Sequence, residues 1–101
     1  MDPDSKPDFM IADVVEPVAG RDAGQLFYVV GTEGEYLLLA NGKDRSLEQP
    51  KRKKRKHAKK VLRSDTRVAE KLRAGDKVLN SELRRDLATF GQQFNSQNQG
   101  G

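Results

Sequence analysis

Two short apolar runs separated by turn residues constrain the fold of this chain most strongly. Gln25–Gly31 carries Leu, Phe, Tyr and two Val, and Tyr36–Ala40 reads YLLLA. Runs of this length, rich in β-branched and aromatic residues, suit strands and are too short for typical helices. A third β-rich run, Met10–Val18, precedes them. We therefore expect a sheet of short strands.

The segments between and after these runs have the residues of tight turns. Ala19–Gly24 has glycine at its end and near its start, and Thr32–Glu35 contains Gly34. Asn41-Gly42 is the usual sequence of a two-residue hairpin turn, so Lys43–Glu48 is predicted to be the return strand, at an edge and stopped by Pro50. Strands about ten residues apart without intervening helices favour a small barrel or sandwich over a parallel sheet.

The apolar period becomes helical after Leu62. Ser64-Asp65 is predicted to cap a short helix over Val68, Ala69 and Leu72 that ends at Ala74-Gly75. A second helix, capped by Asn80 or Ser81, has its stop at Gly91. Its apolar stripe consists of Leu79, Leu83, Leu87, Phe90 and Phe94. Such a stripe most simply packs on the sheet, and binding of a partner is the alternative.

The charge of the chain is divided very unevenly. Lys51–Lys60 (KRKKRKHAKK) holds eight of the 19 basic residues and no acid. Elsewhere 11 basic residues face 15 acidic ones, so the remainder carries −4 although the whole chain carries +4. The basic segment continues into Val61-Leu62, and its second half is predicted to be a last strand that closes the sheet.

A polyphosphate is the partner that the basic segment favours. Lys and Arg that neutralise phosphates release condensed counterions, and Arg also binds phosphate through two N–H groups. The alternatives are a solvated charged segment or a nuclear address. Charge does not separate RNA from DNA. We expect no membrane partner, because no apolar stripe accompanies the cations and no apolar run approaches the roughly 18 residues of a spanning helix.

Composition also bounds the chemistry of the chain. Hydrophobic residues are 35% of 101, which limits the core and disfavours a deep substrate cavity. There is no cysteine and a single histidine, and no motif pairs the scattered acids. We therefore predict no enzyme activity, no catalytic residue, no metal and no cofactor. The first nine residues, acidic and proline-bearing, are unlike a secretory signal, and we expect a cytoplasmic monomer.

The turn after the first strand, read with its flanks, resembles a known family. The pattern Val-Val-x-x-Val-Ala-Gly-Arg-Asp-Ala-Gly-Gln-x-Phe-x-Val-Val is similar to the KOW motif of ribosomal and transcription-elongation proteins. It is closest to the small bacterial relatives of eukaryotic-type large-subunit ribosomal KOW proteins. The resemblance covers about residues 10–62, including Tyr36–Ala40, Asn41-Gly42 and the basic stretch after Pro50. It implies an SH3-like barrel that binds RNA, often ribosomal RNA.

The resemblance and the charge together assign the candidate site. Glycine in the turn would set its geometry and let the backbone approach a phosphate, Arg21 would make a charged contact, and Asp22 would orient Arg21 or cap the turn. Tyr28, if it faces outward, can stack on a base, and packing is the equal alternative. The candidate RNA-binding residues are Gly20, Arg21, Asp22, Gly24, Gln25, Lys43, Arg45, Lys51, Arg52, Lys53, Lys54, Arg55, Lys56, His57, Lys59 and Lys60.

The sequence thus predicts a mainly β protein, a small SH3-like barrel of the KOW type followed by one or two C-terminal α-helices. Residues 1–9 are a disordered lead-in, 10–62 the barrel with basic segment 51–60, 63–94 the helical extension and 95–101 a disordered tail. The predicted function is binding of structured RNA in a ribosome- or translation-associated role. The alternatives are a protein-interaction module, for example one that contacts RNA polymerase, and a general DNA-binding protein.

Overall fold

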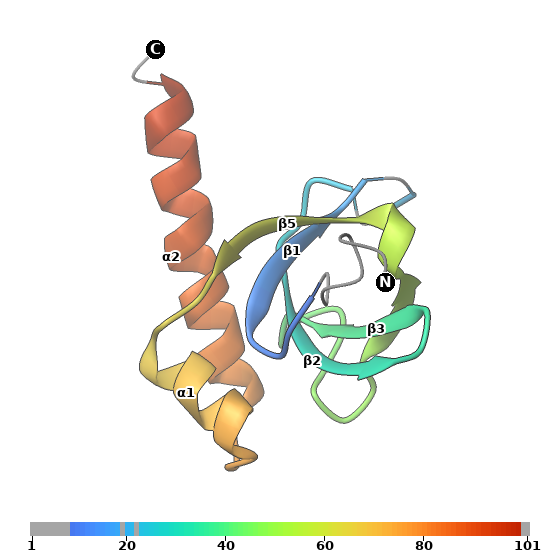
Figure 1. Ribbon diagram of the computed structural model, residues 1–101. Coiled ribbons are helices and arrows are strands. Elements are labelled where there is room, and N and C mark those ends of the chain that lie inside the picture. Colours follow the sequence, from blue (N-terminus) through green and yellow to red (C-terminus); the bar gives the residue numbers. More distant parts are fainter. Residues whose placement is uncertain (1–8, 19, 22, 100–101) are drawn as a thin grey trace, which may run out of the picture.

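A single antiparallel sheet with two helices on its outer side forms the molecule (Figure 1). The computed structural model describes residues 9–18, 20–21 and 23–99, with residues 94–99 described by their backbone alone. The strand order is β4-β3-β2-β1-β5. The elements are β1 (Asp13–Pro17), β2 (Phe27–Glu33), β3 (Tyr36–Ala40), β4 (Lys51–Lys54), the 3₁₀ turn η1 (Arg55–His57), β5 (Ala58–Arg63), α1 (Arg67–Ala74) and α2 (Asn80–Gln99). The prediction of a mainly β fold followed by two helices is confirmed.

The loop after β3 corrects one prediction. Asn41-Gly42 is not a two-residue hairpin turn, and Lys43–Glu48 is not a strand; residues 41–50 form a loop before β4. The Asn41 side-chain oxygen accepts hydrogen bonds from the backbone N–H groups of Lys43 at 2.9 Å and Arg45 at 3.0 Å. The N–H groups of Asn41 and Gly42 donate to the Arg45 carbonyl. Asparagine therefore stabilises a compact loop, through its side chain, where a hairpin was predicted.

The sheet curls strongly, because its two edge strands are consecutive in the chain. Only η1 separates β4 from β5. In a flat five-stranded sheet the edges would stand about 19 Å apart, whereas the step from Lys54 to Ala58 reaches at most about 14 Å. Register shifts at Val14/Val15 and Val29/Gly31 mark bulges, which bend strands. Ladder bonds join β4 to β3 and β5 to β1, so the sheet is curled but not closed into a barrel.

Both faces of the curled sheet are covered by side chains. Inside the curl, Val15, Phe27, Val29, Leu37 and Leu39 form one cluster. Phe9 closes this cluster and is itself buried, so it lies in the core and not in the predicted disordered lead-in. Residues 1–8, the rest of that segment, lie outside the described part.

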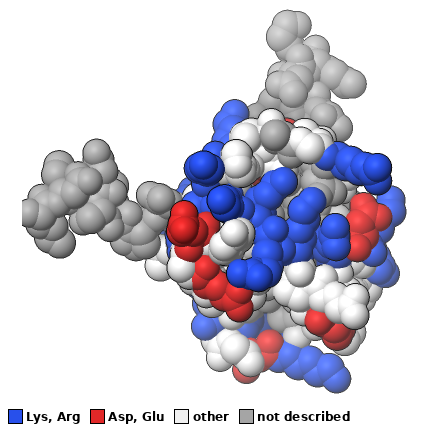
Figure 2. Space-filling model, turned by 90° about the vertical axis from the view of Figure 1, so that its right-hand side faces the viewer, with Lys and Arg blue, Asp and Glu red and all other residues white. Residues whose placement is uncertain are grey.

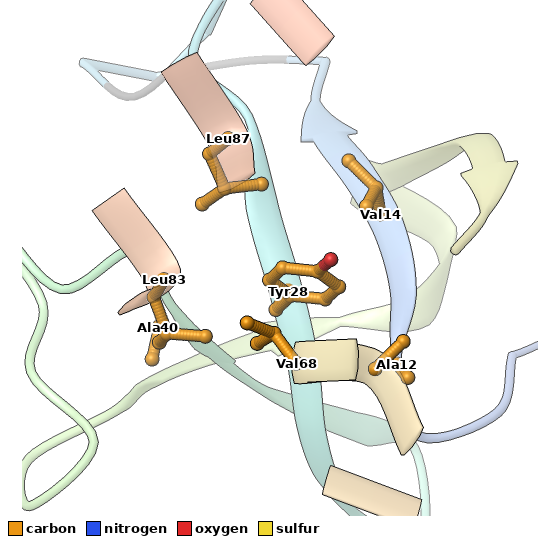
Figure 3. Close-up of a cluster of buried hydrophobic side chains, with 8 residues drawn as sticks. Ala12, Val14, Tyr28, Ala40, Val68, Leu83 and Leu87 are labelled. Atoms are coloured by element: carbon orange, nitrogen blue, oxygen red, sulfur yellow. The ribbon is translucent and has the colours of Figure 1, made fainter. Parts of the chain in front are cut away.

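On the outer face, α1 and α2 cover a second cluster. Val14, Tyr28 and Ala40 of the sheet pack there against Val68 of α1 and Leu83 of α2 (Figure 3). Successive residues of a strand point to opposite faces, so Phe27 and Tyr28 enter different clusters, and both are fully buried. This burial overturns the idea that Tyr28 faces outward to stack on a base.

The helix ends partly follow the sequence signals. Gly75 ends α1 with a φ of 78°, as predicted, but the N-cap is Thr66 and not Ser64 or Asp65. Asn80 begins α2, whereas Gly91 does not stop it. A glycine inside a helix costs only about 1 kcal/mol relative to alanine, so it does not end a helix by itself. The helix continues to Gln99, into the segment predicted to be disordered, and its second half extends past the sheet (Figure 1).

The apolar stripe of α2 packs on the sheet over part of its length. Leu83 and Leu87 are buried, and Phe90 packs against the same cluster. Its ring meets Tyr28 edge-on, with 6.5 Å between the ring centroids. Leu79 precedes the helix and is 54% exposed, so it does not belong to the buried stripe. The side chain of Phe94 lies outside the described residues. Within the described ranges, no helix is long and apolar enough to cross a membrane.

Candidate nucleic-acid interface

The basic segment folds into two edge strands and the turn between them. Its second half enters β5, so a strand is present where the sequence predicts the last one, but this strand pairs with β1 at an edge and does not close the sheet. Its first half is β4, which pairs with β3 and was not predicted as a strand. No local signal in the sequence marks this strand, because all four residues of β4 are basic and their burial does not alternate. The backbone of these cations is therefore held in two paired strands and the short turn that joins them.

The cations gather on one side of the molecule. The right-hand side of Figure 1, where η1 lies, faces the viewer in Figure 2. Lys and Arg side chains form a band across this face, with Asp and Glu side chains to either side of it (Figure 2). We call the side chains of residues 51–60 the basic face. The acids beside it leave a polyanion a limited area on which to dock.

Two cations of the basic face are held by acids and aromatic rings. The guanidinium of Arg52 lies 4.5 Å from the centre of the Tyr36 ring, and its Nε lies 3.4 Å from the Glu33 carboxylate. Lys60 Nζ lies 3.2 Å from Asp13 Oδ2 and 5.7 Å from the centre of the Phe9 ring. Sequence reasoning did not find these four partners.

Lys60 has a structural role in consequence. Asp13 is only 1% exposed, and its Oδ2 also accepts a hydrogen bond from the backbone N–H of Met10. A buried carboxylate is stable in its charged form only when it is paired and hydrogen-bonded. The main role of Lys60 is therefore to neutralise the buried Asp13 carboxylate, although the Lys60 side chain is itself partly exposed.

Arg55 connects η1 to the tip of the β2–β3 hairpin. Its backbone N–H donates to the Glu35 carbonyl at 2.9 Å, and its Nε donates to the Gly34 carbonyl at 2.8 Å. Beside this contact is an open pocket of about 250 Å³ lined by Glu35, Lys54, Arg55 and Lys56. The Val18 N–H donates to the His57 carbonyl, so the same turn is also attached to the end of β1.

The other cations of the face differ in how far water reaches them. Lys56, His57 and Lys59 are exposed and Lys54 is half-buried. Lys51 is half-buried, and desolvation together with the neighbouring charge of Lys53 lowers its pKa. Lys51 and Lys53 are two residues apart and hence on the same side of β4, which brings like charges together.

The glycine turn between β1 and β2 lies next to β4. A Cβ on Gly20 would stand 3.8 Å from Lys53 Nζ. Gly20 and Gly24 have φ values of 88° and 89°, which only glycine adopts without strain. Arg21 is exposed and Gln25 half-buried, whereas Asp22 lies outside the described residues. The structure thus brings the predicted turn and the basic strand together.

Lys43 and Arg45 are exposed on the loop of residues 41–50, which is fastened to α2. Arg84 Nη1 donates to the Gly42 carbonyl at 2.7 Å. The Leu47 N–H donates to Asn80 Oδ1 at 2.8 Å. These two hydrogen bonds attach the loop to α2, a contact that the sequence did not suggest.

Tyr28 belongs to a buried polar network and not to the basic face. Its hydroxyl lies 2.6 Å from Asp86 Oδ2 and 2.8 Å from Ser64 Oγ. A phenol has one proton, and the carboxylate is the stronger acceptor, so Tyr28 donates to Asp86 and the Ser64 hydroxyl donates to Tyr28. Burial, and then the hydrogen bond to Asp86, raise the pKa of Tyr28 to about 12.

Among the residues that the structure describes, no group of three or more histidine, aspartate or glutamate side chains is placed to hold a metal ion. No protein-family model matches the chain, and no curated protein matches it.

Proposed function

We propose that this chain is a cytoplasmic RNA-binding protein of the KOW type, built on an SH3-like barrel and associated with the ribosome or translation. The barrel is supported by the curl of the five strands, by the short η1 link between the edge strands, and by the enclosed cluster inside the curl. The KOW assignment rests on the resemblance of the glycine turn and its flanking strands.

The observation that carries the proposal is the placement of the basic segment on paired strands. β4 and β5 hold its backbone on the sheet, and η1 turns the chain between them. A cation held in place loses less conformational freedom on binding than one on a loose tail. Phosphates of a folded RNA are also fixed in space, so a fixed set of cations can match them.

We expect this face to recognise mainly the shape and the backbone of RNA. Duplex RNA presents its phosphates and 2′-hydroxyls, and its deep major groove is closed to side chains. The glycine turn next to β4 adds a place where backbone can approach a phosphate closely, because Gly20 and Gly24 have no side chain. Arg21, exposed on the same turn, supplies a charge there.

Equilibrium binding to a structured ribosomal RNA fragment tests this proposal. The variant Lys54→Gln/Lys56→Gln/Lys59→Gln removes three charges that no described hydrogen bond or ion pair holds. We expect its affinity to fall at least about tenfold. The matched control Arg67→Gln/Lys77→Gln/Arg85→Gln removes three exposed charges from the helices and their link, and should bind as the unaltered chain does. Equal affinities of the unaltered chain and the Lys54→Gln/Lys56→Gln/Lys59→Gln variant would refute the proposal.

Sedimentation of cell lysate through sucrose gradients tests the ribosomal part of the proposal. At low salt the protein should migrate with ribosomal particles, and at high salt it should be released, because phosphate contacts weaken as salt rises. Free migration at low salt would contradict ribosome association. Retention of a protein partner after nuclease treatment would instead favour the protein-interaction alternative.

A further inference from the structure

We propose that the pocket at η1 binds one unpaired guanine nucleotide of the RNA, with its phosphate on Arg55, Lys54 and Lys56 and its base on Glu35. This inference rests on the proposed RNA-binding function and adds a base preference to it. The pocket lies where η1 meets the tip of the β2–β3 hairpin, and these four residues line it.

The side chain of Arg55 is oriented in advance for a phosphate. Its Nε donates to the Gly34 carbonyl at 2.8 Å, and its backbone N–H donates to the carbonyl of Glu35. Because the Nε is bound, the guanidinium can turn little, and its two Nη groups keep their N–H donors for a ligand. No other hydrogen bond joins these donors to a described residue. Guanidinium N–H groups in this arrangement match phosphate oxygens in pairs.

Glu35 makes the pocket unsuitable for a phosphate alone. An ionised carboxylate only accepts hydrogen bonds, and it repels a phosphate at close range. No ion pair joins Glu35 to a described residue, although three cations line the same pocket. The carboxylate therefore remains available for a ligand group that carries N–H donors.

Guanine is the base that fits a carboxylate best. It has two adjacent N–H donors on its Watson–Crick edge, so one carboxylate can accept both. Uracil has a single N–H between two carbonyl acceptors, and adenine and cytosine have an amino group beside an acceptor nitrogen. Proteins read unpaired RNA bases by hydrogen bonds to these edges. The volume of about 250 Å³ lies below the roughly 300–1,000 Å³ of common ligand pockets, so the pocket has room for no more than one nucleotide.

Nuclear magnetic resonance titrations of the full chain with guanosine 5′-monophosphate and uridine 5′-monophosphate test this inference. Guanosine monophosphate should bind at least about fivefold more tightly, with shifts centred on Glu35 and residues 54–56. Glu35→Gln should bring the two affinities to within about twofold of each other. Arg55→Lys keeps the charge but loses the paired donors, and should weaken both nucleotides. The controls Glu70→Gln and Lys77→Gln, at exposed positions elsewhere, should change neither.

Equal affinity for the two nucleotides, shifts centred away from η1, or an unchanged preference in Glu35→Gln would overturn the inference. These results leave the proposed function standing if structured RNA still binds the unaltered chain and loses affinity in the Lys54→Gln/Lys56→Gln/Lys59→Gln variant. Loss of both nucleotide preference and RNA binding would overturn both proposals.

Discussion

At Gly42 the loop after β3 approaches α2 so closely that no side chain fits. A Cβ there would lie 2.1 Å from the Asn80 carbonyl oxygen and 3.2 Å from Arg84 Cγ, and the φ of Gly42 is 77°. Arg84 donates to the carbonyl of this same glycine, so the contact fastens the loop to the first turns of the helix. The close approach of this loop to α2 therefore requires glycine at position 42.

Substitution of Gly42 by alanine should lower the free energy of unfolding by more than about 2 kcal/mol, because it adds the strain of positive φ to a backbone clash. Gly34→Ala is the matched control. Gly34 also has a positive φ, of 58°, but nothing lies within 4 Å of its Cβ position, so only about 1 kcal/mol should be lost. Urea denaturation of both variants measures the difference. Equal losses would contradict the described approach of the loop to α2.

Tyr28 makes stability depend on pH in the alkaline range. Its pKa is about 12 in the folded chain against an ordinary 10.0, so the folded state holds the phenol proton more tightly than the unfolded state does. The stabilisation is fully present below pH 10, and it is lost as pH rises through 10 towards 12, since the unfolded chain then releases the proton first.

The variant Tyr28→Phe isolates this effect. At neutral pH it should be about 1–3 kcal/mol less stable, because Asp86 loses its phenol donor. The stability of the unaltered chain minus that of the variant should then decrease between pH 10 and 12, because the contributions of all other titratable groups are common to both proteins and cancel. Denaturation series at several pH values provide the measurement. A difference that is constant over this range would show that the phenol is not held in the described network.

At the scale of elements, Thr66 joins the start of α1 to α2. Its Oγ1 accepts a hydrogen bond from the Ala69 N–H at 3.2 Å, which caps the helix, and donates to Asp86 Oδ2 at 2.6 Å. Asp86 also accepts from Tyr28, so one carboxylate connects β2, α1 and α2. Arg73, near the end of α1, donates to the Ser64 carbonyl and fixes the chain before the cap.

Thr66→Ala should therefore lower the free energy of unfolding by about 1–2 kcal/mol, the usual cost of losing an N-cap. Thr89→Ala is the control, because Thr89 is exposed on α2 and bonds only to the Arg85 carbonyl in its own helix among described residues. We expect that change to cost less than about 0.5 kcal/mol. Thermal or urea denaturation compares them, and a Thr66→Ala variant as stable as the control would refute the linking role.

The elements that local sequence determines were predictable, and those set by contacts between distant residues were not. Tyr36–Ala40 is a strand with the predicted bounds, and Gly75 ends α1, because apolar clustering and positive φ are local signals. The prediction of a hairpin turn at Asn41-Gly42 was wrong, because the side chain of Asn41 accepts hydrogen bonds from backbone N–H groups within its own loop.

Prediction of the candidate site was limited for the same reason. The cations of residues 51–60 are evident from composition, but their backbone partners lie up to 45 positions earlier in the chain, in β1 and β3. That Lys60 neutralises Asp13, or that Arg52 stacks on Tyr36, depends on strand pairing that a charge run does not encode. The apolar stripe of α2 predicted its buried face, whereas its length past Gly91 had no local signal.

For the whole molecule, the curl of the sheet places helix packing and the proposed RNA binding on different parts of the structure. The outer face is occupied by α1 and α2, which bury Tyr28 and the cluster around it (Figure 3). The turn η1 and the adjoining parts of β4 and β5 carry the basic face. η1 lies on the side of the sheet opposite α2, whereas the end of β5 reaches the helices (Figure 1). Packing and the proposed binding therefore use largely different side chains. Lys54, Lys56 and Lys59 can be replaced without opening the core. Lys60, in contrast, is needed to neutralise the buried Asp13.

The salt dependence of RNA binding tests the central claim most directly, because it counts the phosphates that the basic face neutralises. The logarithm of the association constant for a structured ribosomal RNA fragment should fall linearly with the logarithm of salt concentration. The slope should be smaller by about 3 in Lys54→Gln/Lys56→Gln/Lys59→Gln, about one for each lysine, and unchanged in Arg67→Gln/Lys77→Gln/Arg85→Gln. Identical slopes for the unaltered chain and the Lys54→Gln/Lys56→Gln/Lys59→Gln variant would contradict phosphate binding by the basic face.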